Sequence, residues 1–188
     1  MTRDDATVGD TGIRGRPRTE DSYGIPASSE GLLPWGFVEE TLAADRTYWV
    51  TTVRPDGRPH ARPTWGVWVD RTFHCGGGER TRWVRNLAVD PEIVVHRESA
   101  EEVVILEGRA RRIDEETADP DLLERLEAAY ERKYGVGHGT PFFAVDPSTV
   151  FAWRDYPEDA TRWEFDVEVE AEDGDANESG TETETEDG

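Results

Sequence analysis

Short blocks of alternating apolar and polar residues fill the middle of the chain. Residues 48–53 (YWVTTV) are β-branched and aromatic, which favours a strand, and residues 55–57 (PDG) after them suit a tight turn. The pattern predicts a second strand over residues 60–69, a tight turn, and a short strand over residues 72–75. Together these segments predict an antiparallel meander.

Three other segments have the spacing of a helix. A proline at the first helical position predicts a helix over residues 34–45, and apolar residues three to four apart predict one over residues 81–89. Residues 121–134 (DLLERLEAAYERKY) give the clearest helix, which ends at Gly135.

Further strands are predicted in the second half of the chain. They cover residues 92–97, 102–113, 149–154 and 162–169. With the meander they make roughly seven strands, and an open sheet of that size would leave long unpaired edges. The pattern therefore predicts a mostly β (α+β) protein, an antiparallel split barrel of roughly six to seven strands with short helices.

The two ends of the chain differ from this central region. Residues 1–30 are rich in Gly, Pro, Ser, Thr and charge, so we expect a flexible segment lying loosely on the surface. Residues 169–188 are acidic and cannot bury enough apolar area to order themselves. One domain is therefore expected at residues 31–168, followed by a disordered tail whose role is solvation rather than docking.

The charge is strongly negative. Asp and Glu number 42 against 21 Lys and Arg, a formal net charge of -21, so nucleic acid and anionic membranes are not expected partners. Lys133 is the single lysine among the basic residues. This composition favours a protein adapted to high internal salt, where the screening length shrinks to roughly 3 Å at 1 M. An ordinary acidic protein is the alternative.

Other classes of protein are excluded by what the chain lacks. Cys75 is the single cysteine, which excludes a disulfide framework and a cysteine-rich metal site. No apolar run approaches the roughly 20 residues that span a bilayer, and the N-terminus lacks the apolar core of a signal peptide. The four histidines have no metal-binding spacing. We expect a soluble cytoplasmic protein with no metal and no catalytic triad.

Several short motifs follow one another in a characteristic order over about residues 33–168. They are Gly57-Arg58-Pro59-His60, Arg62-Pro63, Thr81-Arg82, Asn86-Leu87, Asp90-Pro91, Val104–Gly108 (VILEG), Val150–Trp153 (VFAW) and Thr161–Trp163 (TRW). No motif is specific alone, but in this order and spacing the chain resembles the pyridoxamine 5′-phosphate oxidase family.

The resemblance implies a split β-barrel homodimer with two flavin sites at the subunit interface. The implied cofactor is FMN or, as in some branches, the deazaflavin coenzyme F-420. The implied function is a flavin- or deazaflavin-dependent oxidoreductase acting on a small molecule. A non-catalytic flavin-binding or sensing protein and a haem-binding relative are alternatives. No catalytic side chain is expected, because such a cofactor carries the reaction.

A flavin phosphate requires arginines, hydroxyls and free backbone N–H groups. Residues 76–82 (GGGERTR) have all three. The glycines allow close approach, Thr81 can cap the helix, and Arg80 and Arg82 can each form two hydrogen bonds to phosphate. A flexible loop with exposed arginines is the alternative.

The resemblance also implies roles outside this loop: Arg62 and Trp153 toward the flavin and Arg162 toward the substrate. Ion pairs are the alternative for both arginines, and core packing for Trp153. The predicted cofactor-binding residues are Arg62, Pro63, Thr64, Trp65, Gly77, Gly78, Arg80, Thr81, Arg82 and Trp153, and Arg162 is the predicted substrate-binding residue.

The chain departs from the family pattern at two positions. Trp83 stands where many members have lysine, and its bulk can instead wall the flavin ring. Arg162 is not followed by histidine two residues on, so true pyridoxamine phosphate oxidase activity is not expected.

Overall fold

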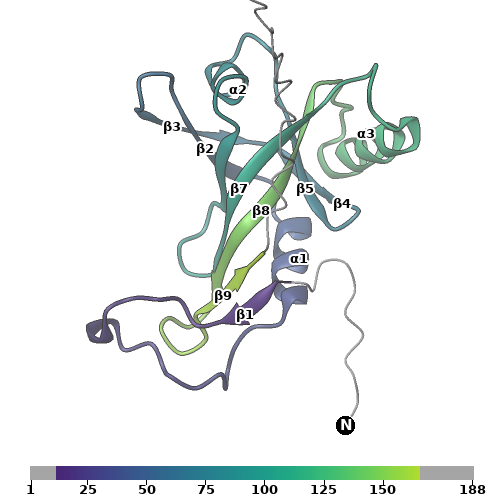
Figure 1. The fold of residues 1–188 in the computed structure, drawn as a ribbon. Helices are drawn as coiled ribbons and strands as arrows, with labels where there is room; N and C mark the ends of the chain where they lie inside the picture. The colour runs from purple at the N-terminus through teal and green to yellow at the C-terminus, as the bar shows by residue number, and fades with distance from the viewer. Residues whose placement is uncertain (1–11, 166–188) are drawn as a thin grey trace, which may run out of the picture.

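One antiparallel sheet organises residues 12–165, the part of the chain that the computed structural model describes (Figure 1). Its nine strands are β1 (Ile13–Gly15), β2 (Tyr48–Val53), β3 (Pro59–Thr64), β4 (Gly66–Val69), β5 (Thr72–Gly76), β6 (Glu92–Arg97), β7 (Val103–Ile113), β8 (Phe142–Trp153) and β9 (Thr161–Glu164). The helices are α1 (Trp35–Ala44), α2 (Arg82–Leu87) and α3 (Pro120–Tyr134), with a 3-10 turn η1 (Asp21–Tyr23). The predicted α+β class, with a mostly antiparallel sheet and three short helices, is confirmed.

The strand order gives the sheet its split-barrel form. One path runs β1-β9-β8-β7-β6-β2-β3, while β5 pairs with β8 on one side and with β4 on the other. Only Trp65 separates β3 from β4, so the chain leaves the β2 edge and joins the β5 edge in one step. The prediction of one strand over residues 60–69 is therefore wrong, because the backbone changes partners at Trp65.

Local signals explain the clearest predicted helix. Asp119 accepts a hydrogen bond from the N–H of Asp121 at 3.1 Å, and Pro120 occupies the first turn of α3. Gly135 ends the helix with a φ of 77°, a conformation that glycine adopts without strain. The predicted helix is thus confirmed, one residue longer than expected.

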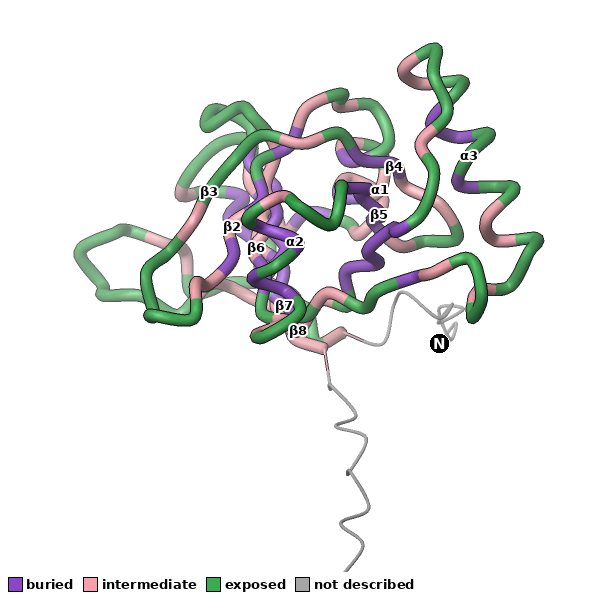
Figure 2. The backbone as a smooth tube through the Cα atoms, turned by 90° about the horizontal axis from the view of Figure 1, so that it is seen from above, coloured by how far each residue is buried: buried purple, intermediate pink, exposed green. Residues whose placement is uncertain are grey.

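Buried side chains form two clusters, one inside the barrel and one beneath α3. In Figure 2 the buried stretches run along β2, β6 and β5 and along the inner side of α2. Tyr48, Phe73 and Trp83 are among the largest side chains of the first cluster, and Tyr130 and Phe142 of the second. Helix α2 therefore belongs to the barrel core, whereas α3 covers a separate apolar patch.

The N-terminal segment is anchored to the far end of the barrel. Strand β1 pairs with β9, and the Arg16 guanidinium donates to the carbonyls of Ser28 at 2.9 Å, Glu158 at 2.8 Å and Ala160 at 3.1 Å. The half-buried Arg16 side chain thus links residues 12–30 to the loop before β9, whereas the flexibility expected for residues 1–30 stays a prediction. The predicted acidic tail lies outside the described residues.

Strand β8 is much longer than the predicted strand over residues 149–154, because the apolar run before Asp146 also pairs with β7. A bulge in this ladder falls between Glu107 and Gly108. A Cβ at Gly108 would lie 2.2 Å from the Asp146 carbonyl oxygen and 2.7 Å from the Pro147 Cα. The glycine of the VILEG motif is therefore required by the close approach of the β8 backbone.

Gly108→Ala is expected to lower the free energy of unfolding by about 1–3 kcal/mol, because the β8 backbone must move to admit the methyl group. Denaturant unfolding in 2 M KCl measures the loss. Gly36→Ala is the control, since a Cβ at Gly36 in α1 meets nothing within 4 Å and alanine favours a helix. Equal midpoints for Gly108→Ala and the parent would contradict this explanation.

Candidate functional site

Helix α2 is positioned by a buried polar contact with the sheet. The Asn86 amide donates to the Thr52 hydroxyl at 2.9 Å, and both side chains are buried. In the β2–β3 ladder Thr52 lies directly opposite His60, and Val50 lies opposite Arg62. Directly opposite residues point to the same face of a sheet. Helix α2 therefore docks on the face of the sheet to which His60 and Arg62 belong.

Four basic side chains gather on this face and are here called the basic cluster: Arg54, His60, Arg62 and Arg82. Arg54 Nη2 lies 3.4 Å from His60 Nδ1. Burial, and then the charges of Arg54, Arg62 and Arg82, lowers the pKa of His60 below its ordinary value. Within residues 12–165, none of the three guanidiniums has a carboxylate within 4.0 Å. On a chain of net charge -21, such a group is suited to hold an anion.

Sequence reasoning found half of this cluster. Arg62 and Arg82 were predicted to bind cofactor, and the structure places both near His60. Arg54 was missed, and His60 was expected, like Pro63, Thr64 and Trp65, to face the flavin ring or pack in the core rather than to bind phosphate. The turn at residues 55–57 could have indicated both, because it pairs Arg54 with Arg58 and thereby sets the register of β2 and β3.

The glycine loop lies directly on the core. A Cβ at Gly77 would lie 2.1 Å from Trp83 Cζ2, so the loop rests on the indole ring. Trp83 is 2% exposed and packs edge-on against Phe143. The idea that Trp83 walls the flavin ring is therefore wrong, because the side chain lies beneath the loop. Gly78 and Arg80 are exposed.

The Thr81 side chain has a different role from the expected one. Its hydroxyl donates to the Gly78 carbonyl at 2.8 Å and accepts no hydrogen bond from the helix. Thr81 is thus the N-cap residue of α2, as predicted, but its hydroxyl makes no capping hydrogen bond and closes the loop instead. The neighbouring Glu79 pairs with Arg112 of β7 at 2.7 Å. Glu79 is the acidic residue next to Arg80 in the sequence, and its carboxylate is thus engaged by Arg112.

The predicted residues 62–65 are divided by the bend between β3 and β4. Arg62 and Thr64 lie on one face of β3, because side chains alternate along a strand. Pro63 lies on the opposite face, where it is paired in register with Trp49. The Trp65 ring is 47% exposed and stacks on Tyr134 of α3, with centroids 4.5 Å apart. Only Arg62 of these four residues is shown beside the basic cluster, by its charge on His60.

Trp153 and Arg162 lie at the other end of the barrel. Phe142 at the start of β8 pairs with Gly76, whereas Trp153 ends the same strand eleven residues later, about 36 Å along a straight strand. Figure 1 shows α2 and β9 toward opposite ends of β8. In one protomer Trp153 therefore lies far from the glycine loop, while Arg162 lies five strands across the sheet from β3 and on the face opposite to that of Arg62.

Arg162 forms an ion pair with a carboxylate of its own strand. Its guanidinium donates to Glu164 at 2.9 Å and is only 13% exposed, while its Nε is buried without a partner among the described residues. Trp153 is half-buried and packs edge-on against Tyr156. The ion-pair alternative for Arg162 is thus observed within the protomer.

A half-exposed row crosses the other face of the sheet, from β3 to β9. Its members, here called the outer row, are Pro63, Trp49, His96, Ile105, Phe151 and Arg162, each paired with the next in register. Trp49 is 36% exposed, and Ile105 and Phe151 are partly exposed. Their neighbours on the inner face, such as Val50 and Leu106, are buried.

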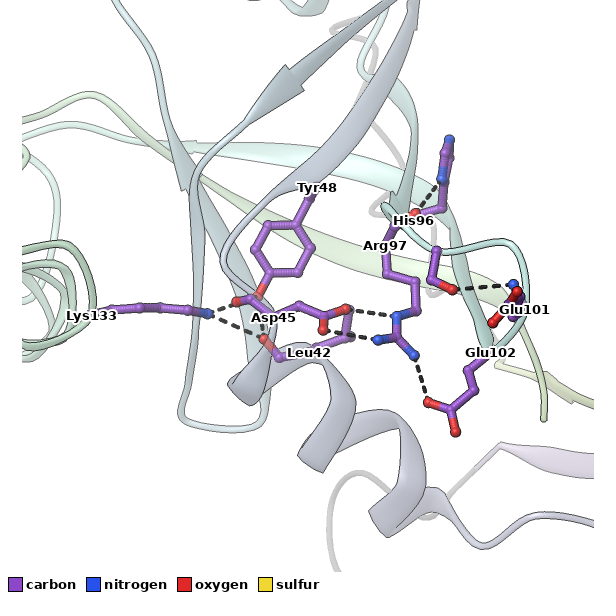
Figure 3. Close-up of polar contacts among 9 residues, drawn as sticks. Leu42, Asp45, Tyr48, His96, Arg97, Glu101, Glu102 and Lys133 are labelled. Atoms are coloured by element: carbon purple, nitrogen blue, oxygen red, sulfur yellow. Dashed lines mark hydrogen bonds and ion pairs between the residues drawn. The ribbon is translucent and has the colours of Figure 1, made fainter.

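The single lysine belongs to a separate polar network (Figure 3). Lys133 Nζ donates to the Tyr48 hydroxyl at 2.7 Å. It also donates to the Gly66 carbonyl at 3.1 Å. Burial lowers the pKa of Lys133 to about 8. Arg97 pairs with Asp45 at 2.8 Å in the same region. The network joins α1, β2 and α3, which gives Lys133 a structural role.

Two further findings bear on the class of protein. No helix within residues 12–165 is long and apolar enough to cross a membrane. The same residues contain no group of three or more His, Cys, Asp or Glu side chains placed to hold a metal ion.

A sequence profile of the family described as pyridoxamine 5′-phosphate oxidase matches residues 36–156. That range runs from α1 past the end of β8, and it includes the basic cluster and the glycine loop. No curated protein matches the sequence.

Solved structures share the fold at low sequence identity. A conserved hypothetical protein from Mycobacterium tuberculosis superposes with a TM-score of 0.56 at 18% identity, over 67% of this chain and 88% of that one. HutZ, the haem storage protein from Vibrio cholerae, gives 0.52 at 17%, over 62% and 92%. A pyridoxamine 5′-phosphate oxidase-related, FMN-binding protein from Nostoc punctiforme gives 0.50 at 17%, over 70% and 90%.

Proposed function

Because this chain belongs to the pyridoxamine 5′-phosphate oxidase family, we propose that it is an oxidoreductase that binds FMN, or the deazaflavin F-420, and acts on a small molecule. The observation that carries the proposal is the basic cluster. The charges of three guanidiniums act on one imidazole there, and among residues 12–165 none of the three is paired with a carboxylate. The cluster lies within the matched range of a chain of net charge -21. A cofactor phosphate is the anion that this family context favours.

The residues present fit a phosphate group. Arg62 and Arg82 each offer a guanidinium that can donate two hydrogen bonds. The glycine loop before Arg82 can approach a ligand closely, since a Cβ at Gly78 would meet nothing within 4 Å. Glu79 pairs with Arg112 and so does not neutralise the cluster. The chain's own residues bind and orient the phosphate end.

The flavin supplies hydride or electron transfer when it is bound. No side chain of the cluster is required to take part in that step. Arg62 and the loop instead set where the cofactor lies.

The proposal includes a two-fold homodimer. Trp153 and Arg162 lie far from the basic cluster in one protomer, so a second copy is needed if they are to reach the same cofactor. The outer row offers a surface for this contact, because Trp49, Ile105 and Phe151 remain partly exposed there. A cofactor at the dimer interface would then have the phosphate contacts of one subunit and the β8–β9 end of the other.

Titration of the apo-protein in 2 M KCl tests the function. FMN or F-420 is expected to bind at least tenfold more tightly than riboflavin, which has the ring but no phosphate. Light scattering of the loaded protein is expected to give a dimer mass. Turnover with the reduced cofactor and candidate small molecules separates an enzyme from a flavin-binding or sensing protein.

Three results would overturn parts of this proposal. Equal affinity for FMN and riboflavin would contradict the proposed phosphate site. A haem absorption spectrum in the purified protein would favour the haem-binding alternative. A monomer mass with cofactor bound would contradict the shared site.

A further inference from the structure

Two members of the basic cluster, Arg54 directly after β2 and His60 in β3, have so far been given no individual contact with the phosphate. We propose that Arg54 and His60 are additional ligands of the phosphate bound by Arg62 and Arg82, with His60 donating through Nε2–H. The inference rests on the proposed function, because it takes the bound anion to be the cofactor's phosphate monoester.

The contact between the two side chains determines how His60 is protonated. Arg54 Nη2 is a donor and lies 3.4 Å from His60 Nδ1, so Nδ1 must accept. A neutral imidazole that accepts at Nδ1 has its proton on Nε2. Arg54 thereby makes Nε2 of His60 a hydrogen-bond donor.

Two donors in this pair lack an acceptor. His60 Nε2 and Arg54 Nε are both buried atoms without a hydrogen-bond partner among residues 12–165. A buried N–H without an acceptor is costly, which favours a ligand that supplies one. The charged side chains around them, Arg62 and Arg82, are donors, so a ligand that accepts hydrogen bonds from all four residues matches the cluster. A phosphate monoester dianion has three peripheral oxygens of this kind.

The charges around His60 all have the same sign. Arg54 faces it from the end of β2, Arg62 from its own strand and Arg82 from α2. Its opposite neighbour Thr52 is neutral and bonded to Asn86 of α2. No carboxylate of the described residues contributes to the lowered pKa of His60.

A phosphate dianion bound beside His60 would offset the positive charges of the three arginines. Its charge favours the imidazolium form, so the pKa of His60 rises when the anion binds. Between the lowered pKa of the free protein and the raised pKa of the complex, binding takes up a proton. The affinity contribution of His60 therefore grows as the pH falls through that window.

Substitutions separate this assignment from a purely structural role. Arg54→Ala and His60→Phe are expected to weaken FMN binding by about 5- to 50-fold while leaving riboflavin binding unchanged. His60→Gln is expected to recover part of the loss, because its amide restores an N–H donor. Arg58→Ala is the matched control: it removes the same charge from the same hairpin, but Arg58 is already paired with Asp56 at 2.7 Å.

The pKa of His60 gives a second readout that does not need flavin chemistry. Its imidazole Cε1 proton, assigned in NMR spectra with the help of His60→Gln, is titrated with FMN, with inorganic phosphate and without ligand in 2 M KCl. We expect both ligands to raise the pKa by about one unit or more, and Arg58→Ala to behave like the parent.

The outcomes distinguish the two proposals. A raised pKa with inorganic phosphate but no binding of FMN or F-420 supports the anion site and overturns the cofactor assignment. FMN binding that leaves the pKa of His60 unchanged overturns the inference and leaves the proposed function standing. Variants at Arg54 and His60 that bind FMN as tightly as the parent also overturn it.

Discussion

Replacing Arg82 by alanine is expected to weaken FMN binding by roughly 10- to 150-fold. A charge-assisted contact to a phosphate contributes on the order of 1.5–3 kcal/mol, and about 1.4 kcal/mol corresponds to tenfold in affinity. Arg82 is exposed at the start of α2, and no carboxylate within residues 12–165 lies within 4.0 Å of it. Fluorescence titration of the apo-protein in high salt measures the loss.

The fold is expected to be almost unaffected by this change, because an exposed arginine near the positive end of a helix contributes little to stability. Arg82→Lys should recover only part of the affinity, since an ammonium cannot donate in a fork to two oxygens. Arg125→Ala is the control, as Arg125 lies on α3 and pairs with Asp70 at 2.8 Å. If Arg82→Ala binds FMN as tightly as the parent, the phosphate lies elsewhere.

Acid is expected to destabilise the protein through His74 by about 3 kcal/mol between pH 7 and pH 4. The side chain is 3% exposed, and its Nδ1 lies 3.1 Å from the Thr72 carbonyl, to which it donates. Burial is the largest cause that lowers the pKa of His74, to about 4 from 6.5. Each pH unit between these values costs about 1.4 kcal/mol.

The direction of this stability change follows from the pH at which the folded and the unfolded state each protonate His74. Below pH 6.5 the unfolded chain protonates His74, but the folded protein does not until about pH 4. The stabilising contribution of neutral His74 is therefore complete above pH 6.5 and is lost progressively down to about pH 4.

Urea unfolding of the parent and of His74→Asn at pH 7 and pH 4 isolates this contribution. The asparagine amide keeps a donor near the Thr72 carbonyl but does not titrate, and all carboxylates are common to both proteins. The parent should lose about 3 kcal/mol more than the variant on acidification. Equal losses would show that His74 does not titrate as its burial implies.

Local residues were sufficient to predict most of the helices and strands. Asp119 and Gly135 mark the ends of α3 by chemistry that acts within one turn, and the residues of β2 favour a strand by themselves. The bend at Trp65, strand β1 and the first half of β8 were not predicted. Each of these depends on a partner strand far away in the sequence, as β1 depends on β9.

Only part of the candidate site was predicted, because the rest also depends on contacts between distant segments. Arg62 and Arg82 were found from the order of the motifs, and the structure places both around His60. The capping hydrogen bond expected of Thr81 is not made and the wall expected of Trp83 is wrong, because the Thr81 hydroxyl donates to the Gly78 carbonyl and the loop lies on the Trp83 indole. Neither contact has a signature in residue type or spacing.

The sequence by itself determined the acidic charge, the turn at residues 55–57, the helical segments and the family's order of motifs. Only the tertiary structure decided which basic side chains share a face. That depends on the register of β2 with β3 and on the bond between Asn86 and Thr52, which joins residues 34 positions apart. Local preferences act over a few residues, whereas a binding site is assembled by packing between segments that have no influence on each other until the chain has folded.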